Sequence, residues 1–200
     1  MRITIYDPQP THLDGDNIIA ALEYPDRVCG INIYYPTSSL LERLATVMQE
    51  PFPVLEYLDL HYYGDQIPLV LPDTFLGGSA PRLWSLTLTA IPFPALPKLF
   101  LSARDLVKLD LYEVPHTGYI SPEAMVTCLS TLTSLKHLTL RFQSPSSRPD
   151  RGSQRPLLPT PVDLPALTEL ELQGVSEYLE DFLAQINTPV IDNTLIAFFN

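Results

Sequence analysis

Two pairs of residues in this sequence carry side chains that could perform catalysis. Cys128 and His116 are 12 positions apart and could act as a nucleophile and its base. Glu169 and Glu171 are two positions apart and could act as an acid and a base. Cys128, however, falls on the apolar stripe of a predicted helix, which indicates a buried and inert thiol. The two glutamates share the outward face of a predicted strand, so we interpret them as a solvated acidic surface.

No other pattern in the sequence indicates chemistry. It contains no GxSxG, no phosphate-binding loop, no HExxH and no paired CxxC. The four histidines, at positions 12, 61, 116 and 137, do not have the spacing of metal ligands. We therefore predict that the protein is not an enzyme and uses no cofactor and no metal ion.

The composition excludes several classes of partner. The chain has 23 acidic and 12 basic residues and a formal charge of −11, which argues against nucleic-acid binding because phosphate contacts need clustered Lys and Arg. No uninterrupted apolar run approaches the roughly 18 residues of a membrane span. The two cysteines are too few and too far apart for a disulfide framework. These features predict a protein of the cytoplasm or nucleus without a membrane contact.

The strongest signal is a repeated spacing of apolar residues, LxxLxL. A truncated copy occurs at Ile3 and Ile5 and a degenerate one at Ile191, Thr194 and Ile196. Counted between their last apolar residues, successive copies are 23 to 32 residues apart. The full copies are VCGINI (28–33), LEYLDL (55–60), LWSLTL (83–88), LVKLDL (106–111), LKHLTL (135–140) and LTELEL (167–172).

This spacing predicts a stack of strands. In xLxL, alternate side chains point to opposite faces, so the leucines share one face and the residues between them share the other. One such strand cannot bury its leucines alone, whereas parallel stacking of many copies builds a continuous core. We therefore predict an α/β fold: a leucine-rich-repeat-like solenoid with parallel strands on the concave face and irregular helices and turns on the convex face.

The segments between the strands predict helices of different lengths. Ser39 is three residues before Glu42, the spacing of a capping box, and an apolar stripe follows over 40–48. Ser121 is a predicted N-cap and is followed by Pro122. Ser176 is likewise a predicted N-cap, before an apolar stripe over 179–186. A shorter helix is expected over 16–24, and only one or two turns are expected at DTFLGG and ALPKLFLSA.

The repeat departs from the common leucine-rich pattern at the bend after each strand. That pattern places Asn or Cys three residues after the last leucine. Here these positions hold Pro36, Tyr63, Ile91, Val114, Gln143 and Val175. Without an asparagine ladder, the backbone groups at the bend must find other partners, and we expect an irregular array.

The residues between the leucines are expected to form a binding surface. Strand alternation places Asn32, Ser85, Thr87, Thr89, Thr139 and Gln173 on the concave face together with our candidate partner-binding residues. These candidates are Tyr34, Tyr57, Asp59, His61, Lys108, Asp110, Tyr112, His137, Arg141, Glu169 and Glu171. Tyr and Arg are frequent anchors of interfaces, although each residue could also be a solvated strand position. Trp84 could be either a core filler or a surface anchor.

One segment interrupts the repeat. Residues 141–161 contain four of the 12 bases and five prolines, and we predict a mobile Pro/Arg-rich insertion loop over 143–161. The alternative is a docking segment tuned by phosphorylation, with Ser144 before Pro145 as the acceptor. We otherwise expect a single irregular repeat domain over 1–200. Because the chain begins on a strand pattern, we expect a fragment of a longer array whose N-terminal edge exposes backbone and core, which favours self-association or poor solubility.

Several phrases of the sequence resemble a known family. YPTSSLLERLATVMQEPFPVL, LPDTFLGGSAPRLWSL, IPFPALPKLFLSA and SEYLEDFLAQINTPV are similar to the large F-box-associated leucine-rich-repeat family of mushroom-forming fungi. The resemblance covers nearly all of the chain. It implies a receptor whose repeats hold a substrate, while an N-terminal F-box docks onto a Skp-type adaptor of a cullin ubiquitin ligase. No F-box precedes the first strand pattern, so the adaptor would be a partner only if an F-box lies upstream.

Two functions follow as expectations. The first is a protein-binding module that recognises the protein or peptide substrate of an F-box-type ubiquitin ligase. The second is a scaffold or structural repeat protein without a ligase link. An F-box in the reading frame upstream of Met1 would favour the first.

Overall fold

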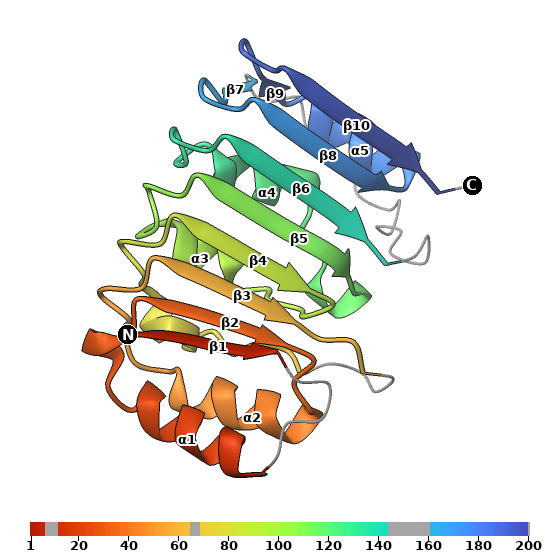
Figure 1. The fold of residues 1–200 in the computed structure, drawn as a ribbon. Helices are drawn as coiled ribbons and strands as arrows, with labels where there is room; N and C mark the ends of the chain where they lie inside the picture. The colour runs from red at the N-terminus through yellow and green to blue at the C-terminus, as the bar shows by residue number, and fades with distance from the viewer. Residues whose placement is uncertain (7–11, 65–68, 144–160, 200) are drawn as a thin grey trace.

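The computed structural model describes residues 1–6, 12–64, 69–143 and 161–199, and its main element is one parallel β-sheet (Figure 1). The strand order follows the chain, β1-β2-β3-β4-β5-β6-β8-β10, and every neighbouring pair is parallel. The strands are β1 (Arg2–Tyr6), β2 (Gly30–Tyr34), β3 (Tyr57–His61), β4 (Ser85–Thr89), β5 (Lys108–Val114), β6 (His137–Phe142), β8 (Glu169–Gly174) and β10 (Asn193–Phe198). Two short strands, β7 (Val162–Asp163) and β9 (Ile186–Asn187), form a separate parallel pair.

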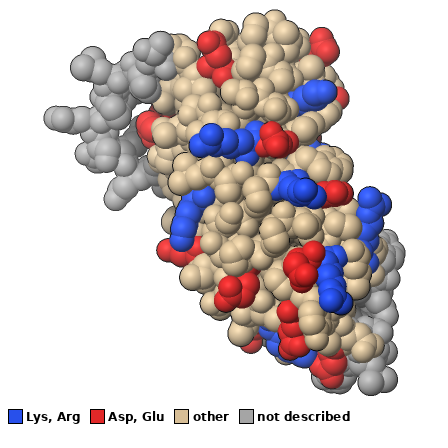
Figure 2. Space-filling view, turned by 90° about the vertical axis from the view of Figure 1, so that its left-hand side faces the viewer, with Lys and Arg blue, Asp and Glu red and all other residues tan. Residues whose placement is uncertain are grey.

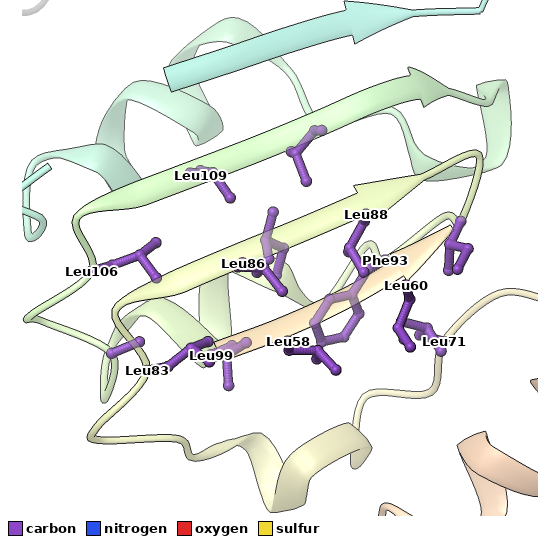
Figure 3. Packing of buried hydrophobic residues seen from close by; sticks show 14 of the residues in the cluster. Leu58, Leu60, Leu71, Leu83, Leu86, Leu88, Phe93, Leu99, Leu106 and Leu109 are labelled. Atoms are coloured by element: carbon purple, nitrogen blue, oxygen red, sulfur yellow. The ribbon is translucent and has the colours of Figure 1, made fainter. Parts of the chain in front are cut away.

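The register of the strands brings equivalent leucines of the repeat together. Leu58 pairs with Leu86, which pairs with Leu109, and the second leucine of each strand forms a parallel row. Figure 3 shows these leucines side by side beneath three neighbouring strands, with Phe93 and Leu99 packed against them. The first leucine of each copy lies in the turn before its strand and is also buried, as Leu83 and Leu106 illustrate. The LxxLxL spacing therefore builds the core, as predicted.

Helices cover the leucine face of the sheet and leave the other face open (Figure 1). The α-helices are α1 (His12–Leu22), α2 (Ser38–Val47), α3 (Leu96–Phe100), α4 (Pro122–Leu129) and α5 (Ser176–Leu183). Single turns of 3₁₀ helix occur at η1 (Pro25–Arg27), η2 (Phe75–Gly78) and η3 (His116–Gly118). The short connections predicted at DTFLGG and ALPKLFLSA are η2 and the five-residue helix α3.

One of the three predicted N-caps is confirmed, and two are wrong. The Ser121 hydroxyl accepts a hydrogen bond from the backbone N–H of Ala124, 3.2 Å away, at the start of α4. In α2, however, Thr37 is the cap and accepts from the N–H of Leu40, so Ser39 lies inside the helix. In α5 the cap position is Val175, and Ser176 is already helical. Helix α1 also begins earlier than the expected 16–24.

The bend after each strand is satisfied by backbone groups instead of an asparagine ladder. Tyr35 donates its N–H to the carbonyl of His61, and Ala90 donates to the carbonyl of Tyr112, at 3.0 and 2.8 Å. Tyr35, Ala90 and Glu113 each lie two residues after the last apolar residue of their repeat, and all three have positive φ angles of 50–56°. Left-handed backbone at this position turns the chain, and at Tyr35 and Ala90 it directs the N–H at the next strand.

The two edges of the sheet differ. At the β1 edge, Ile3 is buried with Ile18 and Leu22 of α1, so the predicted exposure of core is wrong for this residue. Among the described residues β1 pairs only with β2, as the predicted exposure of its backbone requires. At the β10 edge, Leu195 and Phe198 are 58% and 52% exposed.

The predicted insertion loop lies mostly outside the described residues. Arg141 and Phe142 belong to β6 and Pro161 precedes β7, so the ordered strand continues two residues into the segment 141–161. The loop itself, including Ser144, falls on 144–160, which the structure does not describe. None of the helices in the described residues is long and apolar enough to cross a membrane.

Candidate protein-binding surface

The side chains that alternate with the leucines form three rows across the open face of the sheet, called here the polar sheet face. The first row joins Tyr57, Ser85, Lys108, His137 and Glu169 through consecutive register pairs. The second joins Asn32, Asp59, Thr87, Asp110, Thr139 and Glu171. The third joins Tyr34, His61, Thr89 and Tyr112, and continues with Arg141 and Gln173 after an irregularity between β5 and β6. All eleven candidate partner-binding residues therefore lie on one face.

The small side chains of β4 lie lower than the larger side chains of the neighbouring strands β3 and β5. Ser85, Thr87 and Thr89 are only 6%, 6% and 4% exposed, although the sequence predicts that they line the surface. They are buried because the side chains of β3 and β5 are longer and stand on both sides of them. A partner would contact mainly the residues of the flanking strands.

A salt bridge fixes the centre of the polar sheet face. The Lys108 ammonium lies 2.9 Å from a carboxylate oxygen of Asp110, whose side chain is only 5% exposed. Burial lowers the pKa of Lys108, but the hydrogen bond to Asp110 and its negative charge outweigh burial and raise that pKa above its usual value. Lys108 is therefore a fixed positive charge at neutral pH.

Arg141 is held by three neighbours. Its Nε donates a hydrogen bond to Oε1 of Gln173 at 2.9 Å and lies 3.6 Å from the carboxylate of Glu171. The guanidinium also lies over the ring of Tyr112, 5.8 Å from the ring centroid. These contacts orient Arg141 and Tyr112 before any partner arrives, which reduces the entropy lost on binding.

A third pair of a basic side chain and a carboxylate, His137 and Glu169, lies on the same face. His137 Nδ1 is 3.0 Å from a carboxylate oxygen of Glu169, and both side chains are exposed, at 37% and 57%. This contact is an ion pair only when the imidazole is protonated. Because it is exposed, its contribution to stability is small.

Aromatic rings gather where β2 and β3 end. Tyr34 and His61 are stacked with ring centroids 4.4 Å apart, and Tyr63 lies parallel to His61 at 6.4 Å. Tyr35 contacts Tyr63 at 4.8 Å. His61 Nδ1 is hydrogen-bonded to the hydroxyl of Thr89 at 2.8 Å, and burial lowers the pKa of His61 despite the nearby carboxylates. The imidazole is therefore mostly neutral at pH 7.

Two residues of this aromatic group, Tyr35 and Tyr63, are not among the residues predicted from the sequence. Tyr63 continues the alternation 57, 59, 61 by one step, and extending the predicted strand by two residues would have found it. Tyr35 was not predictable, because its left-handed backbone (φ 56°) breaks the alternation. Trp84 could be a core residue or a surface residue from the sequence alone. In the structure it is 46% exposed and therefore lies at the surface.

Two hollows occupy the polar sheet face. One, of about 500 Å³, is lined by residues of β5, β6, β8 and β10, among them Asp110, His137, Glu171 and Leu195. The other, of about 530 Å³, lies between His61 and Tyr63 on one side and Tyr112 and Arg141 on the other, with Thr89 between them. Both are open to solvent, a form that suits side chains of a protein surface better than an enclosed small molecule.

The charges on the molecule are mixed in sign. Figure 2 shows the side at which the strands begin, where Lys and Arg lie singly among Asp and Glu. On the polar sheet face, Lys108 and Arg141 are each next to a carboxylate. A surface of this kind does not concentrate the positive charge that a polyanion requires.

The residues with catalytic potential are not assembled into a site. Burial raises the pKa of Cys128, which disfavours the reactive thiolate. His116 lies in η3, and within the described part of the chain no hydrogen bond joins it to Cys128. Among the described residues, no group of three or more His, Cys, Asp or Glu could hold a metal ion. The absence of catalysis and of a cofactor stays a prediction.

Comparison of the chain with protein-family models, with curated proteins and with solved structures finds no match. The function must therefore be inferred from the polar sheet face itself.

Proposed function

We propose that this chain is a leucine-rich-repeat-type solenoid that binds a protein or an extended peptide on its polar sheet face. One observation carries the proposal: the strands that share a leucine core present three rows of aromatic, charged and polar side chains on one open face. Arg141 and Tyr112 are held in contact there by Gln173 and Glu171, and two hollows lie beside them. Oriented Tyr and Arg side chains next to hollows are typical of binding hot spots.

We propose further that the binding serves ubiquitin ligation, with this chain as the substrate-recognition part of an F-box-type receptor. The support for a role in ubiquitin ligation is the resemblance of several sequence segments to the F-box-associated repeat family. Binding of a Skp-type adaptor would require an F-box, and no residue of this chain is assigned to that contact. A scaffold without a ligase link would share the binding face, but its partner would not be ubiquitinated in a way that depends on this chain.

The test is a paired measurement on a double variant, Tyr112→Ala with Arg141→Ala. A partner is first identified by affinity capture with the wild-type chain, and its affinity is then measured by calorimetry. We expect the variant to lose about 2 kcal/mol, roughly 30-fold in affinity. Its melting temperature should change little, because both side chains are partly exposed and point away from the leucine core.

The chain offers a matched control. Tyr24 and Arg27 form a second cation–π pair, 5.4 Å from guanidinium to ring centroid, outside the polar sheet face. The variant Tyr24→Ala with Arg27→Ala should keep the wild-type affinity. An unchanged affinity of the Tyr112 and Arg141 variant, with intact folding, would remove this face as the binding surface.

A further inference from the structure

The hollow of about 530 Å³, called here the aromatic hollow, has two parallel rings along one side. These rings are His61 at the end of β3 and Tyr63 two residues later, and their planes lie within 4° of each other. Tyr34 stacks on His61 at 4.4 Å and belongs to β2, so it covers the face of His61 that is turned away from β4. The other face of His61 is therefore turned toward Thr89 of β4 and the hollow.

Tyr112 of β5 lies on the opposite side of the aromatic hollow. The guanidinium of Arg141, from the neighbouring strand β6, lies over this ring at 5.8 Å from its centroid. Strands β3 and β5 are two strand spacings apart, about 9.6 Å, with the buried Thr89 between them. A planar ring in van der Waals contact on both sides needs about 7 Å. The aromatic hollow is therefore wide enough for one planar side chain.

The rings around the aromatic hollow are uncharged at neutral pH. Burial lowers the pKa of His61 and raises the pKa of Tyr63 and of Tyr112 above their usual values. Arg141 already occupies the cation–π position of Tyr112, so a second cation at this ring would meet repulsion from the first. Glu113 also lines the hollow, but it is exposed and its charge is screened by water. Neutral rings of this kind favour a further aromatic ring, in stacked or edge-to-face contact.

The hollow of about 500 Å³, called here the acidic hollow, suits a cation instead. It is lined by three carboxylates, those of Asp110, Glu169 and Glu171. The first is compensated by Lys108 at 2.9 Å, and the third lies 3.6 Å from Arg141. Glu169 is 57% exposed, and its ion-pair partner among the described residues, His137, is charged only when protonated. One carboxylate is thus in excess, in a chain whose formal charge of −11 already attracts cationic partners.

The two hollows are neighbours, because Tyr112 lines both. The acidic hollow lies over the first and second rows of the polar sheet face, and the aromatic hollow lies over the third row and the residues beyond it. Successive rows are two residues apart along the strands, so the hollows are separated by one or two rows, about 7 to 13 Å. An extended peptide spans this distance with about two to four residues.

We propose that the partner contributes an extended segment with an aromatic residue in the aromatic hollow and a Lys or Arg, two to four positions away, in the acidic hollow. This inference rests on the proposed function, because it assumes that the polar sheet face is the binding surface. It adds the chemistry and the spacing of the groups that are recognised.

Synthetic peptides test the proposal by fluorescence anisotropy with the 200-residue chain. Each peptide carries one Phe and one Arg in a Gly/Ser background, in either order. The affinity should be highest when the two are two to four positions apart, and about fivefold lower when they are adjacent or about seven positions apart. Cyclohexylalanine in place of Phe keeps the size but removes the π-system, and should weaken binding about fivefold. Gln in place of Arg should weaken it by a similar factor, about fivefold.

Two variants of the protein assign each group to its hollow. Tyr63→Ala should weaken the Phe peptide about fivefold and leave a peptide with Ser in place of Phe unchanged. Glu169→Gln should weaken the Arg peptide about fivefold and leave the Gln peptide unchanged. The matched controls are Tyr24→Ala, at a ring that is 54% exposed outside the polar sheet face, and Glu42→Gln, at an exposed position of α2. Both controls should keep the wild-type affinity, and circular dichroism with melting temperature establishes that each variant is folded.

Peptides that bind no better than the Gly/Ser background, or whose affinity is the same in Tyr63→Ala and Glu169→Gln as in the wild type, would overturn the proposal. Tighter binding when Arg replaces Phe would also overturn it. The captured partner separates this failure from that of the proposed function. If the Tyr112 and Arg141 double variant loses the partner while Tyr63→Ala and Glu169→Gln retain it, the polar sheet face is the binding surface and only the assignment of groups is wrong. If the double variant retains the partner, the proposed function and this inference both fail.

Discussion

Asp110 and Asp59, both in the second row, show that neighbouring groups determine whether a buried carboxylate stabilises or destabilises the fold. Asp110 has the Lys108 ammonium at 2.9 Å. Asp59, two strands away, has a hydrogen bond from Thr87, but its other oxygen is buried without a donor among the described residues. Burial raises the pKa of Asp59 above its usual value, although Thr87, His61 and Lys108 offset part of the shift. The charged form of Asp59 therefore opposes folding at neutral pH.

We expect Asp59→Asn to stabilise the protein at pH 7. The amide keeps an acceptor for Thr87 and removes a poorly solvated charge, so the melting temperature should rise by about 2 °C. The folded state raises the pKa of Asp59, so the wild type gains stability as pH falls and this carboxylate is protonated. The advantage of the variant should therefore shrink toward about pH 4, near the ordinary range of aspartate.

The matched variant Asp110→Asn should have the opposite sign. It removes the carboxylate that compensates Lys108 and leaves that cation without its partner, so the melting temperature at pH 7 should fall. Thermal unfolding of both variants across pH measures the difference. Equal shifts of the two variants would contradict the assignment of an uncompensated charge to Asp59.

The polar sheet face was predictable in part from the sequence. Alternation within xLxL was sufficient to place all eleven candidate residues on one face, since that depends only on the pleat. It could not predict that Thr87 and Thr89 would be buried, because their exposure depends on the length of side chains on neighbouring strands. It also could not predict how the Arg141 guanidinium is held, over the ring of Tyr112 and hydrogen-bonded to Gln173, because the conformation of a long side chain depends on its neighbours. Whether these residues bind a partner stays a prediction.

At the scale of elements, the strands were more predictable than the helix ends. The strand positions follow from a spacing that recurs along the chain, so each copy of the repeat strengthens the prediction of the other strands. A helix cap instead depends on the local backbone at the end of a bend. In the run Thr37, Ser38, Ser39, three hydroxyls could cap α2, and only Thr37 has the extended backbone (φ −66°, ψ 156°) and the bond to Leu40. Sequence spacing alone favoured Ser39, which is helical.

Two leucines, one buried and one exposed, test whether burial decides the contribution of a leucine to stability. Leu109, in β5, is fully buried, whereas Leu101, at the end of α3, is 64% exposed. Leu109→Ala should cost about 3 kcal/mol, since it removes buried methyl groups and leaves a cavity between β4 and β6. Leu101→Ala should change the free energy of unfolding by less than about 0.5 kcal/mol.

Urea unfolding of the two leucine variants gives both free energies directly. The slope of the unfolding transition with denaturant should stay the same in Leu101→Ala. Comparable losses in both variants would mean that the leucine rows do not form the core described here. Such a result would also remove the physical basis of the repeat.

At the scale of the whole molecule, the sheet has the simplest possible order. Each strand pairs only with the strands of the neighbouring repeats, and β7 and β9 lie apart from the sheet. Stability in such an array is the sum of local terms and contacts between neighbours, so it need not be uniform along the chain. β4 has a strand on both sides and all five of its residues are buried, whereas β10 has one neighbour and mostly exposed side chains.

Amide hydrogen exchange should therefore reveal a gradient of protection along the sheet. The amides of Leu195 and Ala197, which face β8 as those of Asn193 and Phe199 do, should exchange at least about tenfold faster than those of β4, because β10 can open without disturbing the centre. Uniform protection from β1 to β10 would mean instead that the sheet opens as one cooperative unit. In that case the coupling between neighbouring repeats would be strong enough for the whole array to unfold together.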